Sequence, residues 1–429
     1  MIQMKLSNKL IAICIILILL ISLITPIIAN DCSYQVINSN ITREKQLFLL
    51  RSEHYLYIKA YENVSEFQII FSFPPDYNYQ VPIMLEILND TTANLIHYKI
   101  ENDTNDPNKN INFTIKFMNK DEKILIHFNC WVLVINHEFE DLPEYVRIPK
   151  REELPEYTKK WLSETEVVQL NRTLIKFQTI KLRGLNNNLI DFAGKVAQFI
   201  KEHRYLLFIL QLKLGLFLNQ DSITTLIING ENVGRSHLAC SFFRLNNVPA
   251  RVILVHNDQG FWSQMHYMVE YYVSNYGWVL LDTTKGETPY ASKRQIINRI
   301  CYPEDENNTK HDYIIPLMKG EERWLWINNE QVKPYYVDCD KGSKSQMFTE
   351  RQIYVNNTEA DYVFHLTESV YSYYEQFLGI NLSGGNLIKF NNAYNAQKNA
   401  IFKLKDNYDL VEYTKEILYA IDEYQKIMV

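Results

Sequence analysis

The sequence lacks any long run of basic residues. Its 44 Lys and Arg are outnumbered by 50 Asp and Glu, which gives a net charge of −6. A nucleic-acid-binding protein needs a concentrated basic surface, so no nucleic-acid partner is expected. The HExxH, CxxC, Walker and GxGxxG patterns are also missing, so neither a metal nor a nucleotide cofactor is predicted. No internal repeat or low-complexity tract is evident.

The chain is long enough and hydrophobic enough to form more than one hydrophobic core. It has 429 residues, of which 47% are hydrophobic and 22% are charged. A single hydrophobic core rarely serves a chain of this length, so two or three domains are expected.

The N-terminus carries the longest apolar run. Lys5 and Lys9 precede an almost purely apolar stretch over residues 10–29, which ends in Pro-Ile-Ile-Ala. Residues 1–30 therefore fit a signal peptide with an imperfect cleavage site, or a membrane anchor, because the run is long enough to span a bilayer. Both alternatives predict a secreted or extracytoplasmic, membrane-anchored protein.

In an exported protein, disulfide bonds and glycosylation can both form. Five cysteines follow the apolar run: Cys32, Cys130, Cys240, Cys301 and Cys339. The first two bracket one predicted region and the last two bracket another, so pairing within each region leaves Cys240 alone. Asn-x-Ser/Thr sequons, which suit surface glycosylation, begin at Asn40, Asn63 and Asn89.

The hydrophobic pattern divides the remainder into a β region, a mixed region and a helical region. Residues 31–140 contain alternating and β-branched runs between Asn, Asp and Pro turns, which predicts a β-sandwich-like domain. Residues 301–350 are irregular and are expected to brace the neighbouring core. Residues 351–429 have three stretches of helical periodicity with Tyr and Phe on their apolar faces, which indicates core packing.

Residues 150–300 alternate between helical and strand character. Helices are expected from Asn187 and over residues 233–245, with Asn232 as the N-cap. After Pro249 the runs ARVILVH, HYMVEYYV and WVLLD predict antiparallel strands, the last two joined by the turn SNYG. This arrangement brings His266, at the start of one strand, toward Asp282, at the end of the next.

These runs resemble the core of the transglutaminase-like superfamily, a permuted relative of papain-type cysteine proteases. The similarity rests on PARVILV, HYMVE and YGWVLLDTT, with sixteen residues from His266 to Asp282. The resemblance implies an α+β fold and thiol chemistry on amides, either hydrolysis or acyl transfer. It also implies that His266 moves the proton and that Asp282 orients the imidazole. Calcium, which some members use, has no recognisable site in this sequence.

The sequence departs from the family at the nucleophile. The family has Gly-x-Cys one helix length before Pro-Ala-Arg, and an ungapped count reaches Gly230-Glu231-Asn232. Asn232 then holds the position of the thiol. Cys240 lies about 12 Å further along a continuous helix, so it could serve as a nucleophile only if the helix began near Gly234 or His237.

Three interpretations of Cys240 remain open at this point: a small buried side chain, a displaced nucleophile, or a metal or disulfide cysteine. His237 is expected on an exposed helix face, His256 at a strand end, and Glu270 on a solvent-facing strand position. The sequence thus predicts either a core without its nucleophile, which binds a peptide, a protein or a cell-surface polymer, or a cysteine-dependent amide hydrolase or acyl transferase that uses Cys240.

Overall fold

The computed structural model describes residues 45–429 with gaps. The residues left out of this range are 93–94, 137–138, 140, 204–218, 229, 258–263, 292–293, 309–316, 320–322, 325, 328–329, 332–336, 340–343 and 428–429. The predicted signal or anchor at residues 1–30 and Cys32 lie outside the described part. None of the described helices has the length and hydropathy needed to cross a bilayer.

The β region forms two antiparallel sheets that share one hydrophobic core. Its first six strands are β1 (Lys45–Ala60), β2 (Phe67–Phe73), β3 (Gln80–Ile87), β4 (Leu95–Asn102), β5 (Lys109–Ile115) and β6 (Lys123–Ile135). One sheet contains β1, β6 and β3, and the other contains β2, β5 and β4. Burial alternates along much of β1, as the sequence pattern predicts for a strand with one face on a core.

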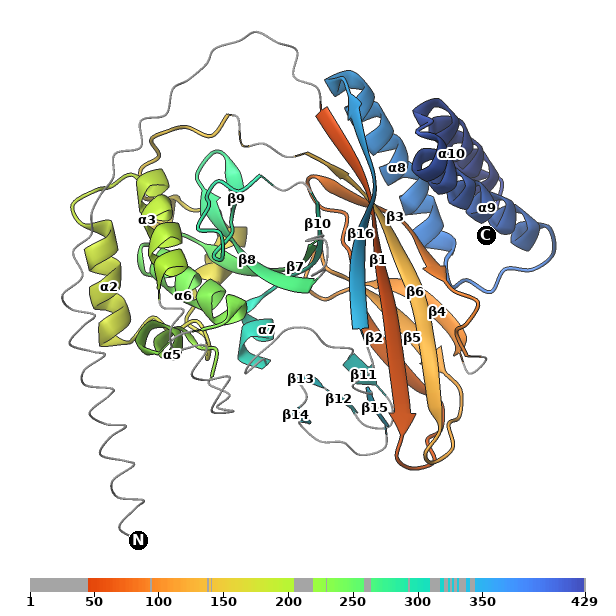
Figure 1. Cartoon of the computed structure of the whole chain (residues 1–429), viewed down its shortest axis with the longest axis horizontal. Coiled ribbons are helices and arrows are strands. Elements are labelled where there is room, and N and C mark those ends of the chain that lie inside the picture. The colour runs from red at the N-terminus through yellow and green to blue at the C-terminus, as the bar shows by residue number, and fades with distance from the viewer. Residues whose placement is uncertain are drawn as a thin grey trace. The chain divides into compact units, whose positions relative to one another are not determined.

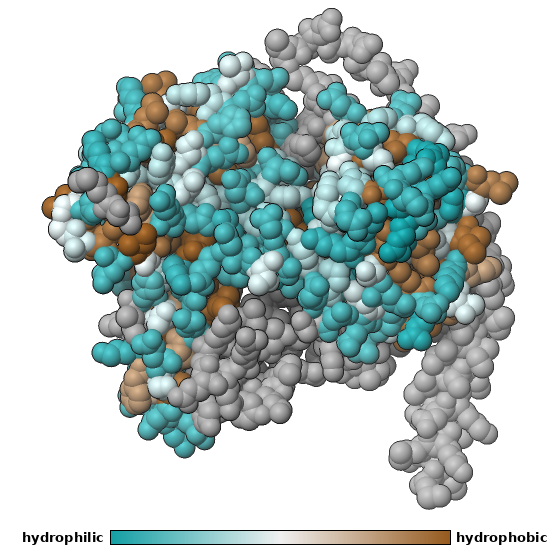
Figure 2. Space-filling model, turned by 180° about the vertical axis from the view of Figure 1, so that it is seen from behind, coloured by the Kyte–Doolittle hydropathy of each residue, from teal (hydrophilic) through white to brown (hydrophobic). Residues whose placement is uncertain are grey.

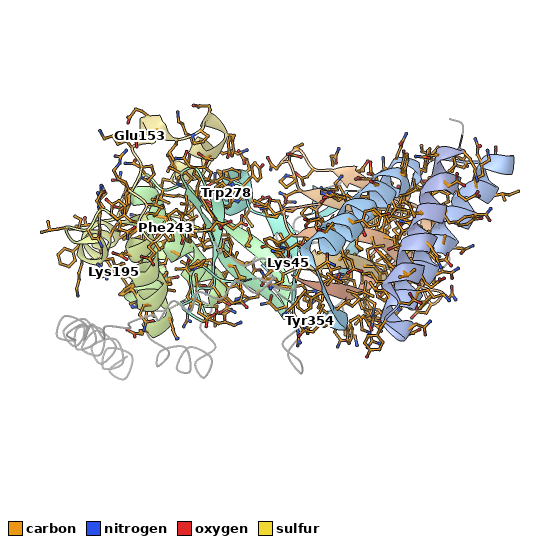
Figure 3. The ribbon with its side chains drawn as sticks, turned by 90° about the horizontal axis from the view of Figure 1, so that it is seen from above. Lys45, Glu153, Lys195, Phe243, Trp278 and Tyr354 are labelled. Atoms are coloured by element: carbon orange, nitrogen blue, oxygen red, sulfur yellow. The ribbon has the colours of Figure 1, made fainter. Side chains whose placement is uncertain are left out.

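Both sheets are completed by strands from the segment that was expected to be irregular. β15 (Val337–Cys339) and β16 (Lys344–Val355) pair with β1, and β11 (Leu317–Lys319) and β12 (Arg323–Trp324) extend the other sheet from β2. A separate small pair is formed by β13 (Trp326–Ile327) and β14 (Glu330–Gln331). Lys45 and Tyr354 mark the adjacent ends of β1 and β16 in Figure 3.

The expectation that residues 301–350 brace the mixed core describes only part of the contacts of this segment. Met347 of β16 packs in one cluster with Ile253 and Met268 of the mixed sheet. In addition, α7 (Pro303–Asn308) carries Glu306, whose carboxylate pairs with Arg244 at 2.5 Å in a fully buried ion pair. The strands after α7 belong to the β region, because they form backbone hydrogen bonds with β1 and β2.

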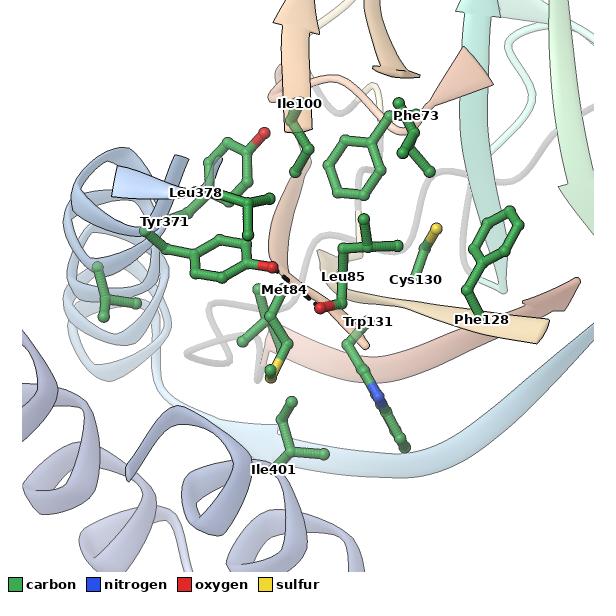
Figure 4. Packing of buried hydrophobic residues seen from close by; sticks show 14 of the residues in the cluster. Phe73, Met84, Leu85, Ile100, Phe128, Cys130, Trp131, Tyr371, Leu378 and Ile401 are labelled. Atoms are coloured by element: carbon green, nitrogen blue, oxygen red, sulfur yellow. Dashed lines mark hydrogen bonds between the residues drawn. The ribbon is translucent and has the colours of Figure 1, made fainter. Parts of the chain in front are cut away.

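The C-terminal helices pack on the β region. They are α8 (Asn357–Phe377), α9 (Gly384–Asn407) and α10 (Leu410–Gln425). Four of their tyrosines are fully or almost fully buried in the same cluster as the strands: Tyr371, Tyr374, Tyr413 and Tyr424. Figure 4 shows Tyr371, Leu378 and Ile401 in one cluster with Met84 and Leu85 of β3. The aromatic stripes are thus part of a core, as their helical spacing predicts.

The mixed region is built around one buried helix. Its helices are α2 (Thr173–Arg183), α3 (Leu189–Glu202), α5 (Ser222–Ile227) and α6 (Asn232–Leu245), preceded by the 3₁₀ turns η1 (Arg151–Glu153) and η2 (Glu156–Leu162). Its sheet has the order β10–β7–β8–β9, with β7 (Ala250–Asn257), β8 (Gln264–Val273), β9 (Gly277–Leu281) and β10 (Gln295–Ile300). Helix α6 lies between the other helices and β7–β8 (Figure 1). All of its residues from Val233 to Arg244 are buried.

Three residues of the family-like motifs stabilise the contacts between the strands of this sheet. Arg251 stands opposite Glu270 in the β7–β8 register, and its guanidinium donates to that carboxylate at 2.8 Å. Trp278 of β9, labelled in Figure 3, lies over the same guanidinium, 3.8 Å from its carbon to the ring centre. Glu270 is 2% exposed, so its predicted solvent-facing position is wrong. A buried, stacked and paired Arg fixes β7, β8 and β9 against one another.

Candidate functional site

A polar group lies where α6 begins, against the sheet. The side-chain amide nitrogen of Asn232 lies 3.2 Å from Nδ1 of His266, and Nε2 of His266 lies 3.4 Å from Oδ1 of Asp282. The structure therefore brings together three of the four residues that the sequence nominates for the site. Their order, with the imidazole in the middle, is that of a nucleophile, base and orienting carboxylate.

Local structure explains how each of the three is placed. Asn232 is the first residue of α6, after an N-cap at Glu231 rather than at Asn232 as expected. His266 and Asp282 come from β8 and from the residue directly after β9, two neighbouring antiparallel strands. A Cβ at Gly230 would overlap the side chain of Thr225 on α5, so glycine permits α5 to approach the start of α6 this closely.

The imidazole of His266 connects the amide to the carboxylate. The Asn232 side-chain N–H donates to Nδ1 of His266, and Nε2 of His266 faces Oδ1 of Asp282. Burial by itself raises the pKa of Asp282, but hydrogen bonds from His266 and from the backbone N–H groups of Lys285 and Thr284 hold the pKa below its usual value. Asp282 is thus a buried carboxylate whose acceptor atoms are in use.

Thr284 is a member of the group that sequence reasoning missed. Its hydroxyl donates to Oδ1 of Asn232 at 3.0 Å, and its backbone N–H donates to Oδ1 of Asp282 at 2.8 Å. Together these bonds fix which way the Asn232 amide points. The signal was available in the sequence: Thr284 lies two residues after Asp282, where a backbone N–H commonly turns back to an aspartate side chain.

Cys240 does not meet the condition for a nucleophile. Helix α6 starts at Asn232 and runs without a break to Leu245, so the late start near Gly234 or His237 is absent. The thiol is fully buried among apolar residues, and burial raises its pKa to about 12. A thiol that stays protonated in a dry core cannot attack an amide. Among the three interpretations of Cys240, this environment favours the small buried side chain over the displaced nucleophile.

Other cysteine and histidine predictions also change. Cys130 and Cys301 are buried free thiols, so the expected disulfides find no support among the described residues. His237 is fully buried on α6, where its Nδ1–H donates to the carbonyl of Gln220 at 2.5 Å, and His256 is fully buried on β7. The exposed position expected for His237 relied on local pattern, whereas other elements cover this side chain. His256 lies near the end of its strand, as expected.

The polar group combines an amide, an imidazole, a hydroxyl and a carboxylate. The nitrogen lone pair of the Asn232 amide is delocalised into its carbonyl, so it cannot play the part of a thiolate. His266 and Asp282 form the second contact of the group, between an imidazole nitrogen and a carboxylate oxygen. Across the described part of the chain, no cluster of His, Cys, Asp and Glu could hold a metal ion.

The comparisons with known proteins give one family match and several similar solved structures. Residues 218–283 match the model of the transglutaminase-like superfamily. A candidate cysteine protease from Cytophaga hutchinsonii is similar in structure at 11% identity and TM-score 0.49, over 73% of this chain and 93% of that one. The periplasmic domain of TgpA from Pseudomonas aeruginosa, solved with ethylmercury, is similar at 10% identity and TM-score 0.24, over 56% and 91%.

No curated protein matches the chain. The family match covers α5, α6, β7, β8, β9 and the aspartate that follows β9, which are the elements that position the polar group. The resemblance drawn from the sequence motifs is confirmed over these residues. The helices and sheets of the structure confirm the predicted α+β class. Residues 218–283 are similar to the core of the transglutaminase-like superfamily.

Proposed function

We propose that this transglutaminase-like domain is a binding module that has lost thiol catalysis. The observation that carries the proposal is the contact between Asn232 and His266, because it places an amide where the chemistry needs a thiolate. Burial of Cys240 supports the proposal, since the thiol is withdrawn from any substrate. The enzyme alternative through Cys240 is not favoured by any contact in the described residues.

The ligand of the module is proposed from the same residues. The resemblance associates this fold with amide substrates, and the start of α6 retains the hydrogen-bonding groups of Asn232, His266 and Thr284. A peptide, a protein or a cell-surface polymer that carries amides is thus the proposed partner. With the apolar N-terminal run, the domain would meet this partner outside the cytoplasm, as a secreted or anchored protein.

The proposal is tested first by haloacetamide labelling of the folded wild-type protein across a pH series. Mass spectrometry locates the label, and His266→Ala is the control. We expect Cys240 to remain unlabelled until the protein unfolds, because its thiol is buried and protonated. Rapid labelling of Cys240 below neutral pH that disappears in His266→Ala would instead establish an activated thiolate and overturn the proposal.

Binding itself needs a separate measurement. The His266 ring resonances in an NMR spectrum report directly on the start of α6, and the probe is a short capped peptide that carries side-chain amides. We expect these resonances to shift on titration, and Asn232→Leu to weaken the effect. Unchanged resonances at saturating peptide, with intact folding, would contradict an amide-binding site at this position.

A further inference from the structure

Helix α2 exposes an apolar stripe opposite the face that it buries. Its buried positions are Ile175, Thr179 and Leu182, which face the core of the mixed region. On the other side, Leu174, Phe177 and Ile180 are 48%, 61% and 69% exposed, at a spacing of three residues that aligns them along the helix. Leu185, just beyond the helix, is fully exposed.

The exposed stripe is accompanied by positive charge. Lys176, Lys181 and Arg183 lie on α2, Arg172 precedes it, and the helix contains no acidic residue. At 100° per residue, Lys176 and Arg183 lie on one side of the stripe and Lys181 lies between Phe177 and Leu174. Lys176 and Arg183 donate to asparagine side chains rather than carboxylates. None of the four forms an ion pair with a described carboxylate, so their charge is not neutralised locally.

Helix α9 also exposes apolar side chains beside lysines, but two of these lysines, Lys398 and Lys405, pair with Glu86 and Glu350. The face drawn in Figure 2 is mainly hydrophilic, with separate hydrophobic patches. The chain as a whole is acidic, with a net charge of −6, whereas α2 carries only basic charges. Large apolar side chains with a basic flank are the features of helices that lie in a membrane interface, where apolar groups enter the acyl boundary and basic groups meet anionic headgroups.

We propose that the exposed face of α2 docks on an anionic lipid surface. The basic residues beside the stripe favour a lipid surface over a second copy of the chain as the partner. Two copies would bring the same unneutralised basic residues together. As a membrane anchor, the apolar run at residues 10–29 would hold the chain beside the same kind of surface. The inference does not depend on what the start of α6 binds.

The experiment places a fluorescent reporter on α2 of the full chain. Phe177→Trp is incubated with phosphatidylcholine vesicles that contain phosphatidylglycerol and brominated acyl chains, and emission is compared with the wild type. The signal is local, so it is informative even where residues 10–29 anchor the chain. Phe402→Trp, at an exposed phenylalanine of α9, is the matched control.

We expect bromine quenching of the new tryptophan at position 177 but not of the one at 402. Lys176→Gln with Lys181→Gln should weaken the docking equilibrium roughly 25-fold, at about fivefold for each basic residue near an anionic surface. Added salt should weaken it as well. Vesicles of phosphatidylcholine alone should quench much less.

Three outcomes would overturn the proposal. The first is an unquenched tryptophan at 177 on vesicles that nonetheless carry the chain. The second is a lipid-independent change in its emission that grows with protein concentration and mass, which would assign the face to a second copy. The third is a lipid-independent, concentration-independent blue shift, which would assign it to a segment of the same chain.

Discussion

The first and the third turns of α6 lie on one helix and have opposite environments. At the first turn, Asn232 is linked to His266 and Thr284 in a polar group next to Asp282. Eight residues later, Cys240 is enclosed by apolar side chains. A helix rises about 1.5 Å per residue, so the two positions are about 12 Å apart and cannot exchange roles. Position along the helix, and not the presence of a cysteine, decides where thiol chemistry is available.

The largest expected effect comes from giving the first turn a thiol. In Asn232→Cys the introduced thiol would lie at the positive end of the helix and beside His266, and both favour the thiolate. We expect haloacetamide to label it in the folded protein near pH 6 at least about 1,000-fold faster than Cys240, which requires global opening. Peptide mapping of the two labels in one sample measures the ratio.

The matched control for this ratio is Asn232→Cys combined with His266→Ala. Removing the imidazole should slow labelling at position 232 below neutral pH and leave Cys240 unchanged. Equal labelling of the two positions would show that a thiol in the first turn is no more reactive than one in the third. That result would contradict the difference in environment between the two turns.

A second prediction concerns pH and His237, which lies between the two turns. Burial lowers its pKa to about 4, whereas an unfolded histidine titrates near 6.5. Between these values the unfolded chain binds more protons, so the stabilising contribution is complete above 6.5 and is lost as pH falls toward 4. His237→Gln keeps a donor for the Gln220 carbonyl and removes the titration.

The free energy of unfolding of the wild type, relative to His237→Gln, should therefore fall by on the order of 3 kcal/mol as pH drops from 6.5 to 4. Urea unfolding at several pH values measures both proteins. His54 and His256, whose pKa values are also lowered by burial, are common to both and cancel in the difference. A pH-independent difference would contradict the burial of a neutral His237.

A smaller effect is expected at Cys240 itself. Cys240→Ser places a hydroxyl among apolar side chains, which should lower the free energy of unfolding by about 1–3 kcal/mol. Cys240→Ala, which adds no polar atom, serves as the control and should cost less. Urea unfolding followed by tryptophan fluorescence provides the values. A serine variant as stable as the wild type would indicate a polar environment and reopen the enzyme interpretation.

The smallest effect is expected at the edge of the polar group. Thr284→Val removes the hydroxyl that donates to Asn232 and should reduce the free energy of unfolding by about 0.5–1.5 kcal/mol. It should also shift the His266 ring resonances, because the Asn232 amide loses the partner that fixes its orientation. Thr284→Ser retains the donor and should leave those resonances in place. A shift of equal size in both variants would show that the Thr284 hydroxyl does not orient the Asn232 amide.

Much of the mixed core could be predicted from the sequence because its signals are local. The helix expected over residues 233–245 is α6, and the runs after Pro249 are β7, β8 and β9. Apolar spacing and turn residues specify such elements within a few residues of chain. The family-like motifs also placed His266 and Asp282 on neighbouring strands, because a short turn between strands leaves few alternatives.

The errors arose where distant segments meet. The strands of residues 317–355 have weak local patterns, and their partners in β1 and β2 lie more than 200 residues earlier in the chain. Glu270 was assigned to solvent from its strand position, but Arg251 and Trp278 cover it. A side chain's environment depends on which element packs against it. The hydrophobic periodicity of its own segment does not specify that element.

The sequence by itself thus determined the α+β core, the family resemblance, and the count that puts Asn232 in the position of the thiol. Only the tertiary structure decided that the Asn232 amide contacts His266, that Thr284 orients this amide, and that Cys240 is sealed in the core. The physical reason is that helix and strand periods fix the direction of a side chain within its own element. Its hydrogen-bond partners and its exclusion from water are fixed by the elements around it.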